Sequence, residues 1–233
     1  MGHVSVIKGN IFNTNCQTIV NTINCVGVMG KGIALVFKLR YPDMFPIYQD
    51  YCNRGLIEIG KLWLYKPDNP LQPWVLNFPT KTHWKLPSEY SYVEAGLKKF
   101  VSTYKEKGIT SIAFPLLGTN NGGLEKDVVL RMMMTYLESC AIPVEIYDYD
   151  PSAPDDLFES FKAKWNSIDP ADRKKITGIR TKKQLQALDE QINNPETKSM
   201  MQLLNIDGVG YKTMACCFDV VMNYVKPQNL FEL

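Results

Sequence analysis

The first 150 residues alternate between short apolar runs typical of strands and amphipathic runs typical of helices. We expect strands at 3–7, 18–22, 60–65, 74–78, 111–115 and 143–149, and helices at 32–39, 44–53, 90–107 and 125–140. This alternation predicts an α/β fold with a largely parallel or mixed central sheet between helices. In such sheets, ligands bind where loops leave the carboxyl ends of the strands. Two glycine-bearing loops, at 24–32 and 117–123, leave strands at that edge.

The pattern changes near residue 150. Pro151–Pro154 is typical of a linker, and only helical patterns follow, at about 155–166, 170–176, 181–192, 196–204 and 211–225. We therefore expect two domains, 1–150 and 151–233, of which the second is small and all-α. The first carries 15 basic and 13 acidic residues and the second 11 of each. Because neither part is a basic tail, any contact with phosphates must be local.

The cysteines and histidines argue against a metal site or a disulfide framework. The six cysteines form no CxxC pair, and the chain has only two histidines. We therefore expect no metal and no cofactor. No apolar run reaches the ~18 residues of a membrane helix, so no membrane contact is expected. The start of the chain shows no secretory signal, and we expect a cytoplasmic location.

The loop after the second strand carries Gly27, Gly30 and Gly32. Glycines let backbone amides approach a pyrophosphate because no Cβ blocks the way. The start of the following helix adds a partial positive charge. The side-chain amide of Asn24 is suited to bind a ribose hydroxyl. A tight turn without a ligand explains this glycine spacing equally well, so both interpretations stay open.

The second glycine-bearing loop, Leu117–Leu124, has the sequence LGTNNGGL. It could close over the same phosphates from the opposite side. A surface turn rich in glycine and asparagine has the same composition. Two such loops at one sheet edge form a cleft, and this favours the ligand-binding interpretation.

A third segment, NFPTKTHWK at 77–85, follows a strand and places Lys81 at its end. A lysine there can act as a point charge for phosphate. It can also be a nucleophile or an acid/base if desolvation lowers its pKa. The alternative is a solvated surface lysine. We interpret Trp84 as a packing residue rather than a stacking platform.

Five segments in order, GN(I), VNTIN, GVMGKGIA, NFPTKTHW and PLLGTNNGGL, resemble the macrodomain family. The resemblance covers essentially all of 1–150. It is strongest to the DNA ADP-ribosyl glycohydrolase antitoxins of the DarG type, which in turn resemble the terminal ADP-ribose glycohydrolase TARG. It implies a macrodomain fold, with a mixed central sheet flanked by helices, that binds ADP-ribose in one cleft. It also implies removal of ADP-ribose from ADP-ribosylated DNA, which reverses a DarT-like toxin.

The resemblance assigns roles to single residues. Lys81 would be catalytic, its neutral amine acting at the anomeric carbon of the distal ribose. Asn24 matches the asparagine that contacts that ribose. Asn10 stands where many macrodomains hold the adenine amino group with an aspartate, and its amide oxygen can accept the same hydrogen bond. The second loop lacks the carboxylate that TARG-type enzymes pair with their lysine, so we assign no acid/base partner.

The resemblance thus implies a set of ADP-ribose contacts on three loops and one strand end. They are Gly9, Asn10, Ile11, Asn24, Val28, Met29, Gly30, Lys31, Gly32, Ile33, Ala34, Thr80, Leu117, Gly118, Thr119, Asn120, Asn121, Gly122, Gly123 and Leu124. Two other functions fit the same motifs. One is a non-catalytic ADP-ribose-binding module in which Lys81 only neutralises phosphate. The other is a phosphatase acting on ADP-ribose 1″-phosphate.

The C-terminal part contains a segment, 203–215, that fits a helix-hairpin-helix pattern. In such a hairpin, a tight turn between two helices aims backbone amides at a DNA phosphate. The DNA-binding residues would be Gly208, Gly210, Lys212 and Thr213, and the segment resembles the hairpins of DNA repair glycosylases. The alternative is an ordinary turn in a protein-binding helical bundle. The balanced charge favours that alternative, whereas a DNA-linked substrate favours the hairpin.

Overall fold

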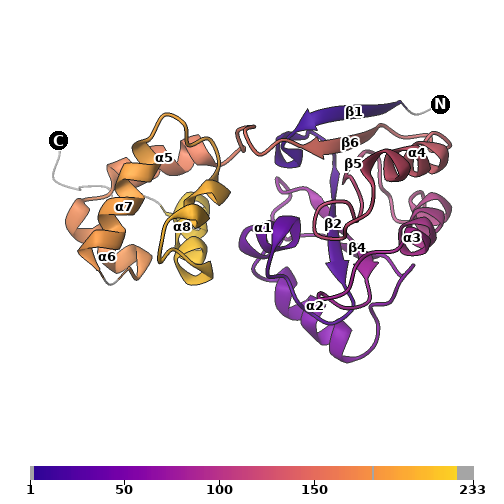
Figure 1. Ribbon diagram of the computed structural model, residues 1–233, viewed down its shortest axis with the longest axis horizontal. Helices are drawn as coiled ribbons and strands as arrows, with labels where there is room; N and C mark the ends of the chain where they lie inside the picture. The colour runs from indigo at the N-terminus through magenta and orange to yellow at the C-terminus, as the bar shows by residue number, and fades with distance from the viewer. Residues whose placement is uncertain (1–2, 180, 225–233) are drawn as a thin grey trace. The chain divides into compact units, whose positions relative to one another are not determined.

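The computed structural model describes residues 3–179 and 181–224. The chain divides into two compact units, Met1–Pro151 and Ser152–Leu233. We call them unit 1 and unit 2. Strands occur in unit 1, and the described part of unit 2 is built from helices (Figure 1).

Unit 1 is built on one six-stranded sheet. Its strands are β1 (Val4–Gly9), β2 (Thr18–Asn24), β3 (Trp63–Tyr65), β4 (Trp74–Lys81), β5 (Ile112–Pro115) and β6 (Val144–Tyr149). They lie in the order β1-β6-β5-β2-β4-β3. Every neighbouring pair is parallel except β3 and β4, which are antiparallel. The predicted mixed sheet is confirmed.

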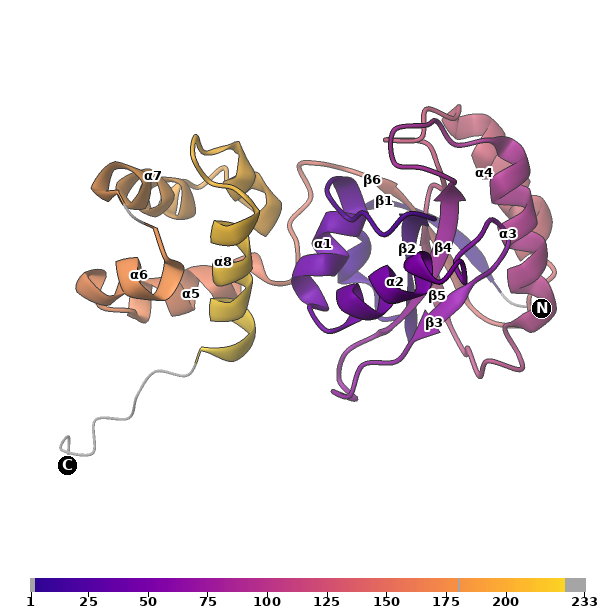
Figure 2. The same cartoon turned by 90° about the horizontal axis from the view of Figure 1, so that it is seen from below.

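Helices cover both faces of this sheet (Figure 2). The helices α1 (Gly32–Arg40) and α2 (Met44–Asn53) pack on one face, and α3 (Tyr90–Thr103) and α4 (Lys126–Leu137) on the other. Side chains alternate between the faces, so Val75 joins the α1–α2 core and Leu76 the α3–α4 core. Burial of each such side chain contributes about 1.5–3 kcal/mol. A short 3-10 helix, η1 (Ile11–Asn13), follows β1.

The fourth strand is longer than its sequence predicts. We expected it to end at Phe78, but β4 continues to Lys81 and pairs there with Asn24 of β2. Pro79 made an early end reasonable, because proline cannot donate a ladder hydrogen bond and is rare in central strands. The structure tolerates it beside a register shift between Ile23 and Asn24. The extension makes Lys81 part of the sheet rather than of the loop.

Unit 2 contains α5 (Phe158–Ser167), α6 (Pro170–Thr177), α7 (Lys182–Asn193), η2 (Met200–Asn205) and α8 (Tyr211–Asn223). The fourth predicted helix, 196–204, is wrong: the chain forms only the 3-10 helix η2. A capping box between Ser199 and Gln202 starts η2, and Asp155 accepts a 2.6 Å hydrogen bond from the amide of Met200. The end of the predicted helix 211–225 lies outside the described residues.

The helix α5 contributes aromatic side chains to the core of unit 2. Phe158, Phe161 and Trp165 of α5 are fully buried. The indole Nε1 of Trp165 donates a 2.6 Å hydrogen bond to Asp189 of α7, and the same oxygen accepts from Arg173 at 2.6 Å. Over residues 3–179 and 181–224, no helix has both the length and the apolar character needed to cross a membrane.

Candidate active site

The predicted ADP-ribose contacts gather at one edge of the sheet in unit 1. Because β1, β6, β5, β2 and β4 are parallel, their carboxyl ends lie together. The segments that leave these ends include Gly9–Ile11 after β1, the loop 25–31 after β2 and the loop 116–125 after β5. The topology therefore places all three predicted loops at the edge where β4 ends with Lys81.

Lys81 is half-buried, and its Nζ donates a hydrogen bond to the backbone carbonyl of Asn121. Burial lowers the pKa of the Lys81 amine below its ordinary value. Within the described chain, no carboxylate lies within ion-pair distance of this amine. The lowered pKa increases the fraction of neutral amine near pH 7, and only the neutral amine is nucleophilic.

Asn121 connects Lys81 to the first glycine loop. A Cβ built on Gly32 would lie 2.5 Å from the side-chain nitrogen of Asn121, and the φ of Gly32 is +57°. The backbone of Asn121 therefore faces Lys81, and its side chain lies against the start of α1. The structure brings together one residue from each of the three predicted motifs.

The side chain of Asn24 shapes the first loop. It is 7% exposed. Its Nδ2 donates a 2.6 Å hydrogen bond to the carbonyl of Val28, and its Oδ1 accepts from the amides of Val26 and Val28 at 3.0 and 3.3 Å. A contact between Asn24 and ribose therefore depends on the second N–H of its amide, since the first is already used.

Tyr48 of α2 holds Asn24 through its hydroxyl group. Its hydroxyl donates a 2.6 Å hydrogen bond to the backbone carbonyl of Asn24 and lies 3.2 Å from its Oδ1. Burial raises the pKa of Tyr48, so the hydroxyl stays protonated and remains a donor. We did not foresee this residue, because a tyrosine inside the predicted helix 44–53 has no feature that sets it apart from a core residue.

The first glycine loop leads into α1 at Lys31. Lys31 precedes α1 with extended backbone and makes no side-chain cap, so the first amides of α1 at Gly32, Ile33 and Ala34 lack a side-chain cap there. Gly30 and Lys31 are exposed. Met29 is 2% exposed and belongs to the core, so only its backbone is able to face a ligand.

The second glycine loop is tightly closed. A Cβ on Gly122 would lie 2.2 Å from the carbonyl oxygen of Gly118, and the φ angles of Gly118 and Gly123 are +70° and +80°. The amides of Gly123 and Leu124 donate to the carbonyls of Thr119 and Gly118 at 3.3 and 3.1 Å. These two amides hold the loop's own shape and are not available to a phosphate. Asn120 at the tip is exposed.

Ser88 holds this loop from the segment before α3. Its amide donates a 3.0 Å hydrogen bond to the carbonyl of Gly122. Its Oγ is buried without a hydrogen-bond partner and would lie 2.3 Å from a Cβ on Gly122. We did not foresee this role, because a serine just before a predicted helix first suggests an N-cap. The residue at that position is Glu89, which makes no side-chain cap.

The remaining predicted contacts are mostly buried. The Oδ1 of Asn10 accepts a 3.1 Å hydrogen bond from the amide of Phe12 and caps η1, so one of its lone pairs is already used. Ile11 and Leu117 are core residues, and Thr80 is 4% exposed. Gly9 ends β1. These residues shape the backbone around the site more than they present side chains to a ligand.

The loop after Lys81 exposes an aromatic side chain. Trp84 is 48% exposed, so the expectation that it is a packing residue is wrong. Its ring stacks on that of His83, with 5.7 Å between the ring centroids. The chain leaves the sheet directly after Lys81, so Trp84 lies in a loop rather than in a strand.

The predicted hairpin of unit 2 forms a turn between η2 and α8. The φ of Gly208 is +79°, and the amide of Val209 donates a 3.0 Å hydrogen bond to the carbonyl of Ile206. Gly210 precedes α8 without a side-chain cap, and Lys212 is exposed on the first turn. Thr213 is partly buried there.

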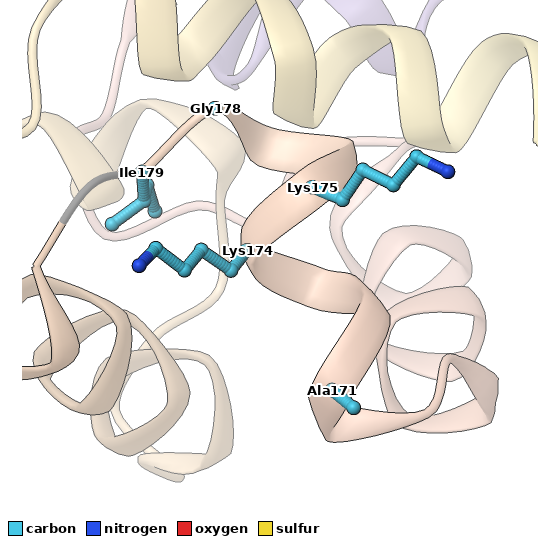
Figure 3. Close-up of a pocket in the computed structure, with 5 residues that line it drawn as sticks. All are labelled: Ala171, Lys174, Lys175, Gly178 and Ile179. Carbon is cyan, nitrogen blue, oxygen red and sulfur yellow. The ribbon is translucent and has the colours of Figure 1, made fainter.

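Unit 2 also has a shallow hollow of about 440 Å³ at the end of α6 (Figure 3). Ala171, Lys174, Lys175, Gly178 and Ile179 line it. The two lysine side chains extend to opposite sides of the helix, and Lys174 points toward Ile179. The hollow has no carboxylate among its lining residues, and Lys81 does not contribute to it.

The family model of the Macro domain matches residues 20–133. A "DNA ADP-ribosyl glycohydrolase" of Mycobacterium tuberculosis is 43% identical over 144 residues, which are 60% of this chain and 40% of that protein. A fusion protein of Thermosipho africanus, "DNA ADP-ribosyl transferase-DNA ADP-ribosyl glycohydrolase", is 40% identical over 161 residues, 62% of this chain and 42% of that protein. The chain thus spans about 40% of the length of these curated relatives.

Among solved structures, the macrodomain of Mycobacterium tuberculosis DarG is similar to this chain with a TM-score of 0.60 and 39% identity. The likeness covers 63% of this chain and 98% of that one. Thermosipho africanus DarTG in complex with ADP-ribose gives a TM-score of 0.61 and 41% identity, over 65% of this chain and 42% of that one. Both the sheet topology of unit 1 and these matches lead to one assignment: the chain belongs to the Macro domain family.

Proposed function

We propose that unit 1 removes ADP-ribose from ADP-ribosylated DNA. The observation that carries the proposal is the position of Lys81. Its desolvated amine lies at the carboxyl edge of the sheet and is held by the backbone of Asn121 between two glycine loops. A lysine that only neutralised phosphate would bind best fully charged, whereas burial here favours the neutral form.

The loops provide the features needed to hold ADP-ribose around this amine. The first amides of α1, beginning at Gly32, are free of a side-chain cap and carry the positive end of the helix dipole, which suits a pyrophosphate. Asn10 and Asn24 offer amide groups for adenine and the distal ribose. The other predicted contacts contribute shape and backbone.

The reaction then needs two steps at the distal ribose. The neutral amine of Lys81 attacks the anomeric carbon, and the bond from that carbon to the base nitrogen breaks, so the base leaves with a proton. Water next replaces the amine at the same carbon, which releases ADP-ribose and restores Lys81. A nucleophile divides one difficult displacement into two easier ones.

The relatives support the choice of DNA as the carrier of the ADP-ribose. Those at 40–43% identity are named DNA ADP-ribosyl glycohydrolases, and one is fused to a DNA ADP-ribosyl transferase. We propose that this chain likewise opposes a DarT-like transferase and acts in the cytoplasm. Relatives named ADP-ribose 1″-phosphate phosphatase are 32–33% identical, over 28–31% of this chain.

The test is a substrate panel with the full chain. We expect wild-type protein to release free ADP-ribose from an ADP-ribosylated oligonucleotide and to leave ADP-ribose 1″-phosphate unchanged. Release of inorganic phosphate from the second substrate alone would make the protein a phosphatase. Binding of ADP-ribose without turnover of either substrate would make it a non-catalytic reader.

We further propose that the hairpin of unit 2 contacts DNA backbone. Gly208, Gly210, Lys212 and Thr213 would present amides and donors to one phosphate. The exposed Lys182 and Lys183 at the start of α7 add charge nearby, because Gln184 reaches the carbonyl of Gly208 at 3.5 Å. We expect Lys212→Ala to weaken DNA binding a few-fold and to reduce the salt slope by about one. If Lys212→Ala and wild type have the same DNA affinity and the same salt slope, the hairpin does not contact DNA.

A further inference from the structure

The loop that follows Lys81 carries a feature that ADP-ribose binding does not use. Trp84 is 48% exposed, and the neighbouring Leu86 is 51% exposed. The indole of unit 2, Trp165, is by contrast fully buried. Both exposed apolar side chains stand in the loop that begins directly after Lys81.

One ring contact reaches Trp84, and two hydrogen bonds hold the residue that makes it. The rings of His83 and Trp84 are 26° from parallel, with centroids 5.7 Å apart. His83 is in turn fixed by the turn it starts: its Nδ1 accepts a 3.2 Å hydrogen bond from the amide of Lys85, and its carbonyl accepts a 3.0 Å bond from the amide of Leu86. The His83 ring that backs the indole is therefore held by two hydrogen bonds of its own turn.

A cation lies beside the same ring. The Nζ of Lys85 is 5.0 Å from the centroid of the Trp84 ring, and the lysine is exposed. A cation over an exposed aromatic ring contributes only a few-fold in an equilibrium constant, about 2- to 5-fold. A nucleobase stacked on an aromatic ring contributes more, about 5- to 150-fold. A base would therefore displace the ammonium group, which is then free to reach a backbone phosphate.

The platform is within reach of the reacting atoms. Three residues of chain span at most about 11 Å, which limits the distance between the Cα atoms of Lys81 and Trp84. In the proposed reaction, the base is bonded directly to the anomeric carbon that Lys81 attacks. The base therefore sits one bond from the atom that Lys81 attacks, and the loop 82–86 begins at the residue directly after Lys81.

We propose that Trp84, backed by His83, is the stacking platform for the nucleobase that carries the ADP-ribose. The inference rests on the proposed function and adds a residue that positions the base. A base inside a duplex already stacks on its neighbours and cannot lie on a second ring. The base on Trp84 is therefore one that is not stacked in a duplex, and Lys85 takes the adjacent phosphate.

The experiment compares Trp84→Ala, Trp84→Phe and wild type on an ADP-ribosylated single-stranded oligonucleotide. We expect Trp84→Ala to raise KM about tenfold, within the range for one stacked base, with kcat within about twofold of wild type. Trp84→Phe keeps an aromatic face and should restore KM to within about threefold. The affinity for free ADP-ribose should be the same in all three proteins. Leu71→Ala, at the opposite end of β4 and 91% exposed, is the matched control and should not change KM.

Each outcome decides between distinct conclusions. If the wild type releases ADP-ribose and Trp84→Ala has the same KM, the platform is wrong and the proposed function stands. A Trp84→Ala protein that loses affinity for free ADP-ribose equally has a structural defect, and this too overturns the platform. If the wild type releases no ADP-ribose, the proposed function fails and the inference with it. Annealing the complementary strand should slow the wild type, and equal rates on both substrates would contradict the requirement for an unstacked base.

Discussion

The two units of this protein use glycine in opposite ways. In unit 1, a Cβ on Gly122 would lie 2.2 Å from the backbone of Gly118, and the buried Ser88 closes the other side. In unit 2, the nearest atom to a Cβ on Gly208 would be the side-chain nitrogen of Gln184, at 2.1 Å, and a Cβ on Gly210 would meet nothing within 4 Å. The first loop system is fixed by backbone packed on backbone, whereas the second is a turn beside a side chain that can move.

This difference indicates which unit is suited to hold a reacting group and which to bind a DNA backbone. A reacting amine must be held within a fraction of an ångström, and the packed loops around Lys81 meet that need. A contact with DNA backbone tolerates more variation, because phosphates repeat along the strand and carry no sequence information. This difference fits the proposed reaction in unit 1 and the proposed DNA contact in unit 2.

The largest expected effect comes from removing the amine. Lys81→Ala should lower kcat for release of ADP-ribose by about a thousandfold or more, because the nucleophile is lost. The affinity for ADP-ribose should change only a few-fold. Steady-state release and calorimetric titration measure the two quantities. Lys61→Ala, a surface lysine paired with Glu58, is the control. A large loss in Lys61→Ala, or none in Lys81→Ala, would break the assignment of the chemistry to this site.

The next effect tests whether the units fold independently. Asp189→Ala leaves the Nε1 of the buried Trp165 and the side chain of Arg173 without their shared acceptor. We expect the free energy of unfolding of unit 2 to fall by about 2–4 kcal/mol. ADP-ribose affinity should stay unchanged, because the proposed ADP-ribose site lies in unit 1. Thermal unfolding with and without ADP-ribose separates the two transitions. Glu190→Ala is the matched control, and a parallel loss of ADP-ribose affinity in Asp189→Ala would show that the units are coupled.

A third effect tests the packed loop. Gly122→Ala adds a methyl group against Gly118 and Ser88 and should destabilise unit 1 by about 1–3 kcal/mol. It should also weaken ADP-ribose binding about tenfold or more, because the loop must open. Chemical denaturation and titration measure both. Gly30→Ala meets nothing closer than 3.9 Å and should keep its stability to within about 0.5 kcal/mol. Equal stability of the two variants would contradict the comparison of the units.

A fourth test, which needs no substitution, is the pH dependence of the wild type. Burial lowers the pKa of Lys81, and the neutral amine is the reactive form. The rate of the first step should therefore rise with pH, about tenfold per unit below that pKa, and level off above it. The midpoint should lie below the ordinary lysine value of about 10.4. A single-turnover pH profile checks this. A rate that falls as pH rises through the midpoint would mean that the charged amine is required.

Much of unit 1 could be predicted, because the alternation of strands and helices follows from side-chain period and parallel strands bring their carboxyl ends together. The helix 44–53 is confirmed to the residue. The end of β4 could not be predicted, because a proline such as Pro79 usually ends a central strand. The register shift that accommodates Pro79 lies in the neighbouring strand β2. Tyr48 and Ser88 were missed because they act through backbone groups far away in the chain. In unit 2, helical patterns located most elements. The 3-10 helix η2 could not be predicted, because the amide of Met200 at its start donates to Asp155, which is far away in the chain.

The measurement closest to the central claim is the capture of the bond between Lys81 and the ribose. The full chain is mixed with an ADP-ribosylated single-stranded oligonucleotide in the presence of a borohydride. In the proposed adduct, the ribose ring opens when the bond from the anomeric carbon to the ring oxygen breaks, the Lys81 nitrogen forms an imine, and the ring oxygen takes the proton from that nitrogen. Borohydride reduces this imine to a stable secondary amine. We predict that release of ADP-ribose slows and that one ADP-ribose is found on the peptide containing Lys81. Release at the full rate with no ADP-ribose on that peptide, or with ADP-ribose on another lysine, would contradict the account.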